Sequence, residues 1–177
     1  MNAYPKTMLT LLLLLLSGCA DTHKLTRSGG SQVAVFLERQ ASAYVAVTTD
    51  GRYGATVYSG SGAMTAQVVA SAFAQYLGKI VTGTKAEDLD QALSTARAGN
   101  FRYLIYPQIL HWEDRATEWS GKPDIAIVKL SVLSTDTGTV LDSAVIEGKS
   151  GLATFGGDHP QDLLPKPMNE YASSLFK

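Results

Sequence analysis

The chain has 177 residues, of which 45% are hydrophobic, and it carries 16 acidic and 15 basic side chains. This length and composition are typical of one globular domain with a substantial core. The formal net charge of -1 argues against a general binder of nucleic acid or of acidic lipid, because those partners select a strongly basic surface.

The first eighteen residues predict a signal peptide. They contain one charged side chain, Lys6, and an apolar run over residues 8–16. This run has the length of a signal-peptide core but is shorter than the roughly 20 apolar residues of a membrane-spanning helix. Residues 1–18 are therefore expected to be removed from the mature protein.

Residues 16–19, Leu-Ser-Gly-Cys, follow this leader and are similar to the lipobox of bacterial lipoproteins. The resemblance implies cleavage before Cys19 and a diacylglyceryl group on its sulfur, which makes membrane lipid a partner of the chain. Two alternatives stay open: a buried free thiol and a thiol in an uncleaved leader. Cys19 is the only cysteine, so an intrachain disulfide is impossible.

The residue after the cysteine bears on sorting. Retention in the inner membrane typically requires Asp at this position, whereas the chain has Ala20. The resemblance to lipoproteins therefore implies the periplasmic face of the outer membrane. The inner membrane is the alternative, because Asp21 lies one place later.

Residues 19–32 predict a flexible tether between the lipid and the domain. The segment is polar, contains Gly29-Gly30 and has no apolar period, as is typical of linkers. His23 is expected to be a solvated side chain of this linker. Residues 33–177 are predicted to form a single globular α/β domain, whose first residues, 33–37, suit either a helical turn or an edge strand.

Strands and helices alternate in the first half of this domain. A strand over residues 44–48 ends at the turn dipeptide Asp50-Gly51, and a glycine-rich loop follows. Apolar residues at every third or fourth position predict a helix over residues 64–77, and residues 79–82 suit a short strand. The pair Thr84 and Glu87 has the spacing of a capping box, which predicts a second helix beginning there.

The second half is dominated by strands. Residues 101–112 predict a long strand, in which Pro107 indicates an edge or a bulge. Residues 124–133 alternate, with one face wholly apolar and Ile125 and Ile127 on the other, and residues 140–147 return as the hairpin partner after a turn at Gly138. In the tail, prolines predict broken turns up to a helix that begins at Met168.

The predicted order is strand, helix, strand, helix, three strands and a final helix. This order predicts an α+β fold with an α/β-like start, in which a mixed sheet of about five strands carries helices mainly on one face. It resembles the amino-terminal domain of TolB and related periplasmic lipoproteins, such as the curli secretion lipoprotein and the peptidoglycan-synthase activator, most closely in VKLSVLSTDTGTVLDSAVIEG. Over the whole mature chain, including DGRYGATVYSGSG and FRYLIYPQILHWEDR, it is similar to the bacterial lipoproteins with domain of unknown function 4823, a family that implies no activity.

Patterns for nucleophilic, phosphate and metal chemistry are incomplete. Ser61 lacks the two outer glycines of a nucleophile elbow, and Gly60 and Gly62 are not followed by the Gly-Lys-Ser/Thr of a phosphate loop. His111 and His159 have no second histidine at ligand spacing. We therefore expect no metal and no cofactor, and no enzymatic activity.

Carboxylates near the end of the long strand offer one further catalytic hypothesis. Glu113, Asp114 and Glu118 could act as acid and base in glycoside cleavage. A solvated loop supplies such carboxylates equally well, and we favour that interpretation.

Two loops are better candidates for contact with a partner. The stretch HWEDRATEWSGKP joins two strands by an unusually long loop, and its Trp112, Arg115 and Trp119 belong to the residue types that dominate binding energy. The alternative is that Trp112 closes the end of the core and Trp119 covers it. The glycine-rich loop offers Arg52, Tyr53 and Tyr58, whose aromatic rings could instead pin the loop.

These observations predict a non-enzymatic, lipid-anchored envelope module. It would bind another envelope protein, or assemble with itself, through its loops and an exposed sheet edge. The alternative is a small-ligand or envelope-glycan binder, with the ligand in a groove between the glycine-rich loop and the long hairpin.

Overall fold

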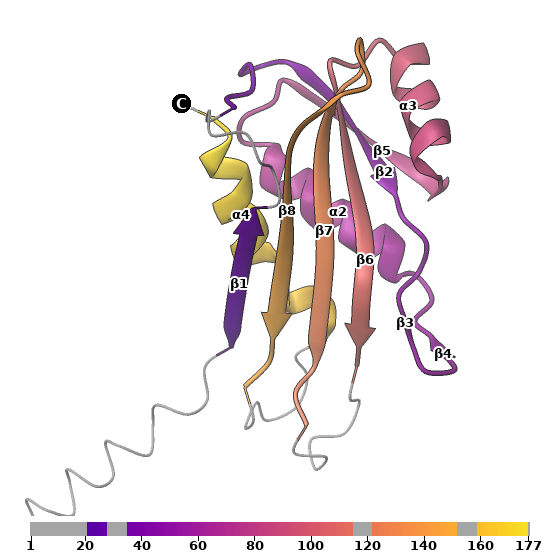
Figure 1. The fold of residues 1–177 in the computed structure, drawn as a ribbon, viewed down its shortest axis with the longest axis vertical. Coiled ribbons are helices and arrows are strands. Elements are labelled where there is room, and N and C mark those ends of the chain that lie inside the picture. Colours follow the sequence, from indigo (N-terminus) through magenta and orange to yellow (C-terminus); the bar gives the residue numbers. More distant parts are fainter. Residues whose placement is uncertain (1–20, 28–34, 115–121, 152–158, 177) are drawn as a thin grey trace, which may run out of the picture.

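The computed structural model describes residues 21–27, 35–114, 122–151 and 159–176, and the predicted signal peptide and Cys19 lie outside them. Its main feature is a six-stranded sheet with the strand order β1-β8-β7-β6-β2-β5 (Figure 1). The strands of this sheet are β1 (Thr22–Arg27), β2 (Ser42–Val47), β5 (Lys79–Ala86), β6 (Tyr103–Glu113), β7 (Ile125–Ser134) and β8 (Val140–Lys149). A two-stranded hairpin, β3 (Arg52–Tyr53) and β4 (Thr56–Val57), forms a second sheet.

Three helices and one short turn complete the described fold. They are α2 (Ser61–Phe73), α3 (Leu89–Ala98), the 3₁₀ turn η2 (Pro160–Leu163) and α4 (Pro165–Ser174). None of the helices in the described residues is long and apolar enough to cross a membrane.

The sheet is mixed, as the sequence predicts. β2 runs parallel to both β5 and β6, because α2 and α3 provide the long crossovers that parallel neighbours require. β6, β7 and β8 then form an antiparallel meander. The predicted α+β fold is confirmed, with one strand more than expected, since β1 adds to the free side of β8.

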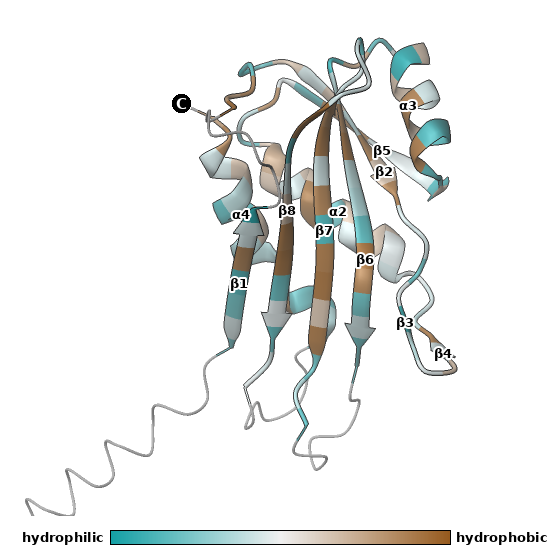
Figure 2. Ribbon diagram, viewed as in Figure 1, coloured by the Kyte–Doolittle hydropathy of each residue, from teal (hydrophilic) through white to brown (hydrophobic). Residues whose placement is uncertain are grey.

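The flexible tether predicted for residues 19–32 is wrong for its central part. Residues 22–27 form β1, which pairs antiparallel with β8 from Thr22 opposite Lys149 to Arg27 opposite Ala144. The segment is mostly hydrophilic (Figure 2), with Leu25 packed against the core. Its backbone supplies the hydrogen bonds of an edge strand, for which polar side chains are common.

The helix start predicted at Thr84 is also wrong. β5 continues to Ala86, and α3 begins at Leu89 behind a different capping box. In that box Asp88 Oδ1 accepts a hydrogen bond from the Gln91 amide at 2.9 Å, and Gln91 Oε1 accepts one from the Asp88 amide at 3.3 Å. This reciprocal arrangement satisfies two amides that would otherwise be unpaired at the helix start.

The tail becomes helical earlier than predicted. α4 begins at Pro165, three residues before Met168, and Pro160 opens the turn η2. A proline is tolerated in the first turn of a helix, because the amide that it lacks has no partner inside the helix there. In the undecided stretch 33–37, the described residues 35–37 form neither helix nor strand.

Helices cover both faces of the sheet, but unequally. α2 and α4 pack together on one face, where the main core includes Phe73, Ile105 and Tyr171, and both lie behind the strands in Figure 1. α3 lies on the other face, over β2 and the beginning of β6, with a smaller core around Leu104 and Tyr106. The predicted concentration of helices on one face is therefore confirmed.

Tyr171 makes the fold sensitive to high pH. Its side chain is fully buried, and its hydroxyl donates to Asp142 Oδ1 at 2.8 Å. Burial, followed by the Asp142 carboxylate, raises the pKa of Tyr171 above its ordinary value of 10.0. The native state therefore holds this proton to a higher pH than the unfolded chain does. The resulting stabilisation is complete below the unfolded pKa of about 10 and is lost as the pH rises above it.

We accordingly expect the free energy of unfolding to fall above about pH 10, by up to ~1.4 kcal/mol per pH unit from this one phenol. Urea unfolding of the mature protein between about pH 9 and about pH 11 measures the slope. Tyr171→Phe should reduce the slope, and Tyr53→Phe, a change at an exposed ring, should leave it as it is. An unchanged slope in Tyr171→Phe would contradict the assignment.

Candidate functional site

The glycine-rich loop and the described start of the second predicted contact loop, His111–Asp114, meet at one end of the sheet. This loop end consists of the β3–β4 hairpin, the end of β6 with Asp114, the beginnings of β1 and β7, the end of β8 and His159 before η2 (Figure 1). Tyr58 Oη donates to the Asp114 carbonyl at 3.4 Å. The ring of Tyr53 packs edge-to-face against that of His111, with the centroids 5.5 Å apart. The glycine-rich loop is thus held against β6.

Trp112 belongs to the core and does not form a contact surface. Its side chain is 1% exposed and lies in the main core cluster with Ala126 and Val128. The backbone of Gly51 approaches it so closely that a Cβ at that position would lie 2.4 Å from Trp112 Cβ. The alternative interpretation, in which Trp112 closes the end of the core, is the one that the structure supports.

The other predicted contact residues differ in accessibility. Arg52 and Tyr53 are exposed and Tyr58 is half-buried. Arg115 and Trp119 lie outside the described residues, so the hypothesis for them stays a prediction.

Each of the three histidines lies close to a carboxylate. For two of them the carboxylate is far away in the sequence, and for His111 it is Glu113, two residues later. His159 Nδ1 is 3.3 Å from Asp114 Oδ2, and His111 Nε2 is 3.2 Å from Glu113 Oε2. His23, which the sequence predicts to be solvated, lies 3.2 Å from Glu170. No sequence signal points to the pairs of His159 and His23, because the partners are far apart along the chain. Within the described ranges, no group of three or more His, Cys, Asp or Glu could hold a metal ion.

The beginning of α2 is filled by the chain's own side chains. Ser61 is fully buried, donates from Oγ to the Tyr58 carbonyl at 2.7 Å and accepts from the Gly51 amide at 2.7 Å. The Gly62 amide donates to Asp50 Oδ1 at 2.9 Å, which places a carboxylate where a phosphate would bind at a helix start. Ser61 and Gly62 therefore hold the glycine-rich loop in shape.

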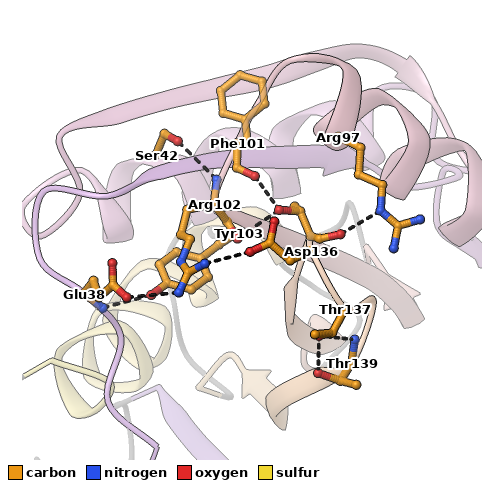
Figure 3. A network of polar contacts seen from close by, with 10 residues as sticks. Glu38, Ser42, Arg97, Phe101, Arg102, Tyr103, Asp136, Thr137 and Thr139 are labelled. Atoms are coloured by element: carbon orange, nitrogen blue, oxygen red, sulfur yellow. Dashed lines mark hydrogen bonds and ion pairs between the residues drawn. The ribbon is translucent and has the colours of Figure 1, made fainter.

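A polar network closes the opposite end of the sheet (Figure 3). Arg102 lies between two carboxylates, with Nη1 at 2.9 Å from Asp136 and Nη2 at 3.1 Å from Glu38. Arg97 Nε donates to the Thr135 carbonyl at 2.6 Å. A shallow groove of about 450 Å³ lies between the two arginines. These contacts tie the β7–β8 turn to α3 and to the beginning of β6, and exposed ion pairs of this kind contribute little stability.

A third feature is the part of the sheet that lies opposite α2 and α4. We call it the open face; in Figure 1 it is turned toward the viewer. Leu110 is 55% exposed on it, and Ile125, Ile127 and Val145 are half-buried. The register interleaves these aliphatic side chains with polar and charged ones, namely Gln108, His111, Lys129, Glu147, Lys149 and Lys24. The alternation in β7 was the available sequence signal, since its second face keeps Ile125 and Ile127.

Comparison with solved structures shows which proteins share this fold. The PelC dodecamer from Paraburkholderia phytofirmans is 16% identical with a TM-score of 0.62, over 84% of this chain and 96% of that one. Lipoprotein GNA1162 from Neisseria meningitidis is 11% identical with a TM-score of 0.50, over 76% and 94%. The mixed sheet with its helices is therefore a fold shared with a dodecameric protein and with a bacterial lipoprotein.

The family is shown by the sequence itself. The chain belongs to the family described as a domain of unknown function, DUF4823, which matches residues 36–175. No curated protein is significantly similar to it.

Proposed function

We propose that the chain is a lipoprotein of the bacterial envelope, anchored through acylated Cys19 at the periplasmic face of the outer membrane, and that it works by binding protein and not by catalysis. The lipobox, the family and the fold shared with a lipoprotein from Neisseria meningitidis support the anchored class. The bound protein is a neighbouring envelope protein or further copies of the same chain.

The open face carries this proposal. It combines half-buried aliphatic side chains such as Ile127 and Val145 with charged neighbours such as Lys129 and Glu147. Because the register interleaves the two kinds of side chain, a protein partner could gain apolar contact and complementary charge on the same face. An open sheet face suits another protein better than a small molecule, because a small molecule binds in a concave pocket. That one protein of this fold is a dodecamer supports assembly of several copies.

Photo-crosslinking in native membranes tests the proposal. A photoreactive amino acid at Val145, on the open face, is expected to give a product of defined mass: a multiple of the protein's own mass for assembly, or one added partner. The same group at Lys166, exposed on α4 on the other side of the sheet, is the matched control. Equal products from both positions, or none from Val145, would contradict binding through the open face.

A charge on the open face should weaken the association without unfolding the domain. Leu110→Asp places a carboxylate at a side chain that is 55% exposed, and we expect the Val145 product to fall at least about tenfold, which corresponds to ~1.4 kcal/mol. Ser71→Asp, at an exposed position of α2, should leave the product unchanged. If Leu110→Asp has no effect while muropeptides or glycans raise the melting temperature, ligand binding is the better account.

A further inference from the structure

The residues that follow the predicted lipidation site closely, 21–27, are bound to the sheet. Asp21 Oδ1 accepts a hydrogen bond from the Gly151 amide at 3.0 Å, and β1 begins at the next residue. All six residues of β1 pair with β8. At the far end of β1, Arg27 lies 3.5 Å from Asp142 and 5.8 Å above the Tyr171 ring. β1 is therefore an integral edge of the sheet.

This arrangement limits how far the lipid can be from the domain. Cys19 precedes Asp21 by two residues, which span at most about 7 Å. The acyl chains on Cys19 would then insert directly beside the beginning of β1, where Thr22 lies opposite Lys149. β1 begins at the loop end, the same end at which β6 and β8 finish and the β3–β4 hairpin projects (Figure 1).

We infer that β1 sets the orientation of the domain on the bilayer: the loop end rests on the lipid headgroups and the β7–β8 turn points away from the membrane. This inference rests on the lipid anchor of the proposed function and adds the face that the anchor presents to lipid. The strands then stand upright, with Val140 about 30 Å above the end of β8, since nine residues separate it from Lys149. The open face becomes perpendicular to the membrane, where it can meet neighbours anchored in the same leaflet.

The side chains at the loop end suit contact with headgroups. Tyr53 is 43% exposed and Val57 is 49% exposed on the β3–β4 hairpin, beside the cation Arg52. A tyrosine with an apolar ring and a polar hydroxyl is favoured at the boundary between lipid and water. Asp21 and Asp114 lie at the same end and balance the charge of Arg52, so the contact does not require anionic lipid. It depends on the position of the anchor and on the exposed side chains of Tyr53 and Val57.

Fluorescence quenching in vesicles tests the orientation. The sole native cysteine is consumed by lipid, so a thiol introduced by Val57→Cys or Val140→Cys can be labelled singly with an environment-sensitive dye. These two valines are similarly exposed, at 49% and 56%, but lie at opposite ends of the sheet. In phosphatidylethanolamine and phosphatidylcholine vesicles with nitroxide-labelled headgroups, we expect quenching of the Val57 label to exceed that of the Val140 label several-fold.

A second variant shows whether β1 is the cause. An insertion of about twelve Gly and Ser residues between Ala20 and Asp21 gives the lipid a flexible linker with a span of roughly 20 Å, and the difference between the two labels should shrink. Mass spectrometry of the same preparations reports on Cys19. Equal quenching of the two labels in acylated protein overturns the orientation alone, whereas an unmodified Cys19 overturns both the orientation and the anchored function.

Discussion

Cys19→Ser is expected to abolish incorporation of fatty acid into the protein. The thioether to the diacylglyceryl group requires the sulfur, and this is the only cysteine in the chain. Each buried methylene contributes about 0.8 kcal/mol of membrane affinity, so the loss of two or three acyl chains removes more binding free energy than any other single substitution could. Metabolic labelling with an alkyne fatty acid measures the incorporation, and the mass of the wild-type mature protein should show a lipidated residue 19 at its amino terminus.

The matched control returns a cysteine to the chain at a position outside the lipobox. In the Cys19→Ser background, Ser31→Cys returns a cysteine to the chain but not to the junction with the leader. Fatty-acid labelling should stay absent in this double variant. Labelling that persists in Cys19→Ser would show that another group carries the lipid, and the lipobox interpretation would fail.

Trp112→Ala is expected to destabilise the fold by about 3–5 kcal/mol, the range for removing a large aromatic side chain from a core. The side chain is 1% exposed, and the close approach of Gly51 gives the surrounding backbone little room to collapse into the cavity. Urea unfolding of the mature protein in detergent, followed by circular dichroism, measures the change. A contact residue on the surface would instead weaken binding and leave stability nearly unchanged.

Tyr53→Ala is the appropriate comparison for Trp112→Ala. Tyr53 lies at the same end of the sheet but is 43% exposed, so its replacement should cost about 1 kcal/mol, mainly the edge-to-face contact with His111. If Trp112→Ala lowered the free energy of unfolding by no more than Tyr53→Ala does, Trp112 could not be a structural part of the core.

Trp112 was a predicted contact residue and is a core residue, which shows that residue type alone does not tell the two roles apart. Along β6, Ile105 and Ile109 face the main core, and strict alternation would place His111 there and Trp112 on the open face. A register shift between Ile109 and His111 reverses this, because His111 lies opposite Ile127 and Trp112 opposite Ala126. A bulge of one residue exchanges the two faces of a strand, and only the pairing with β7 shows that it is there.

Sequence patterns predicted the helices and hairpins that depend on residues close together in the chain. The β7–β8 hairpin follows from alternation over residues 124–133 and from Gly138, which has a φ of 73° in the turn. The helix predicted over 64–77 is present as α2, which begins three residues earlier and ends four residues earlier, at Phe73. The start of α3 was misplaced because the chain offers a second capping-box pair three residues apart, Asp88 and Gln91, and this is the pair that forms. Glu87 instead accepts hydrogen bonds from Tyr44 at 2.5 Å and from Thr95 at 2.7 Å.

The sequence by itself determined the family, the α+β class and the predicted lipid anchor, because each depends on residues that are neighbours in the chain. The tertiary structure alone decided that residues 22–27, shortly after the predicted anchor, belong to the sheet. The polar residues 22–27 become a strand only because β8, some 120 residues later, leaves a row of backbone donors and acceptors for them to pair with. For the same reason, tertiary pairing turned an expected linker into an edge of the sheet, and brought the glycine-rich loop, the end of β6 and His159 together at one end.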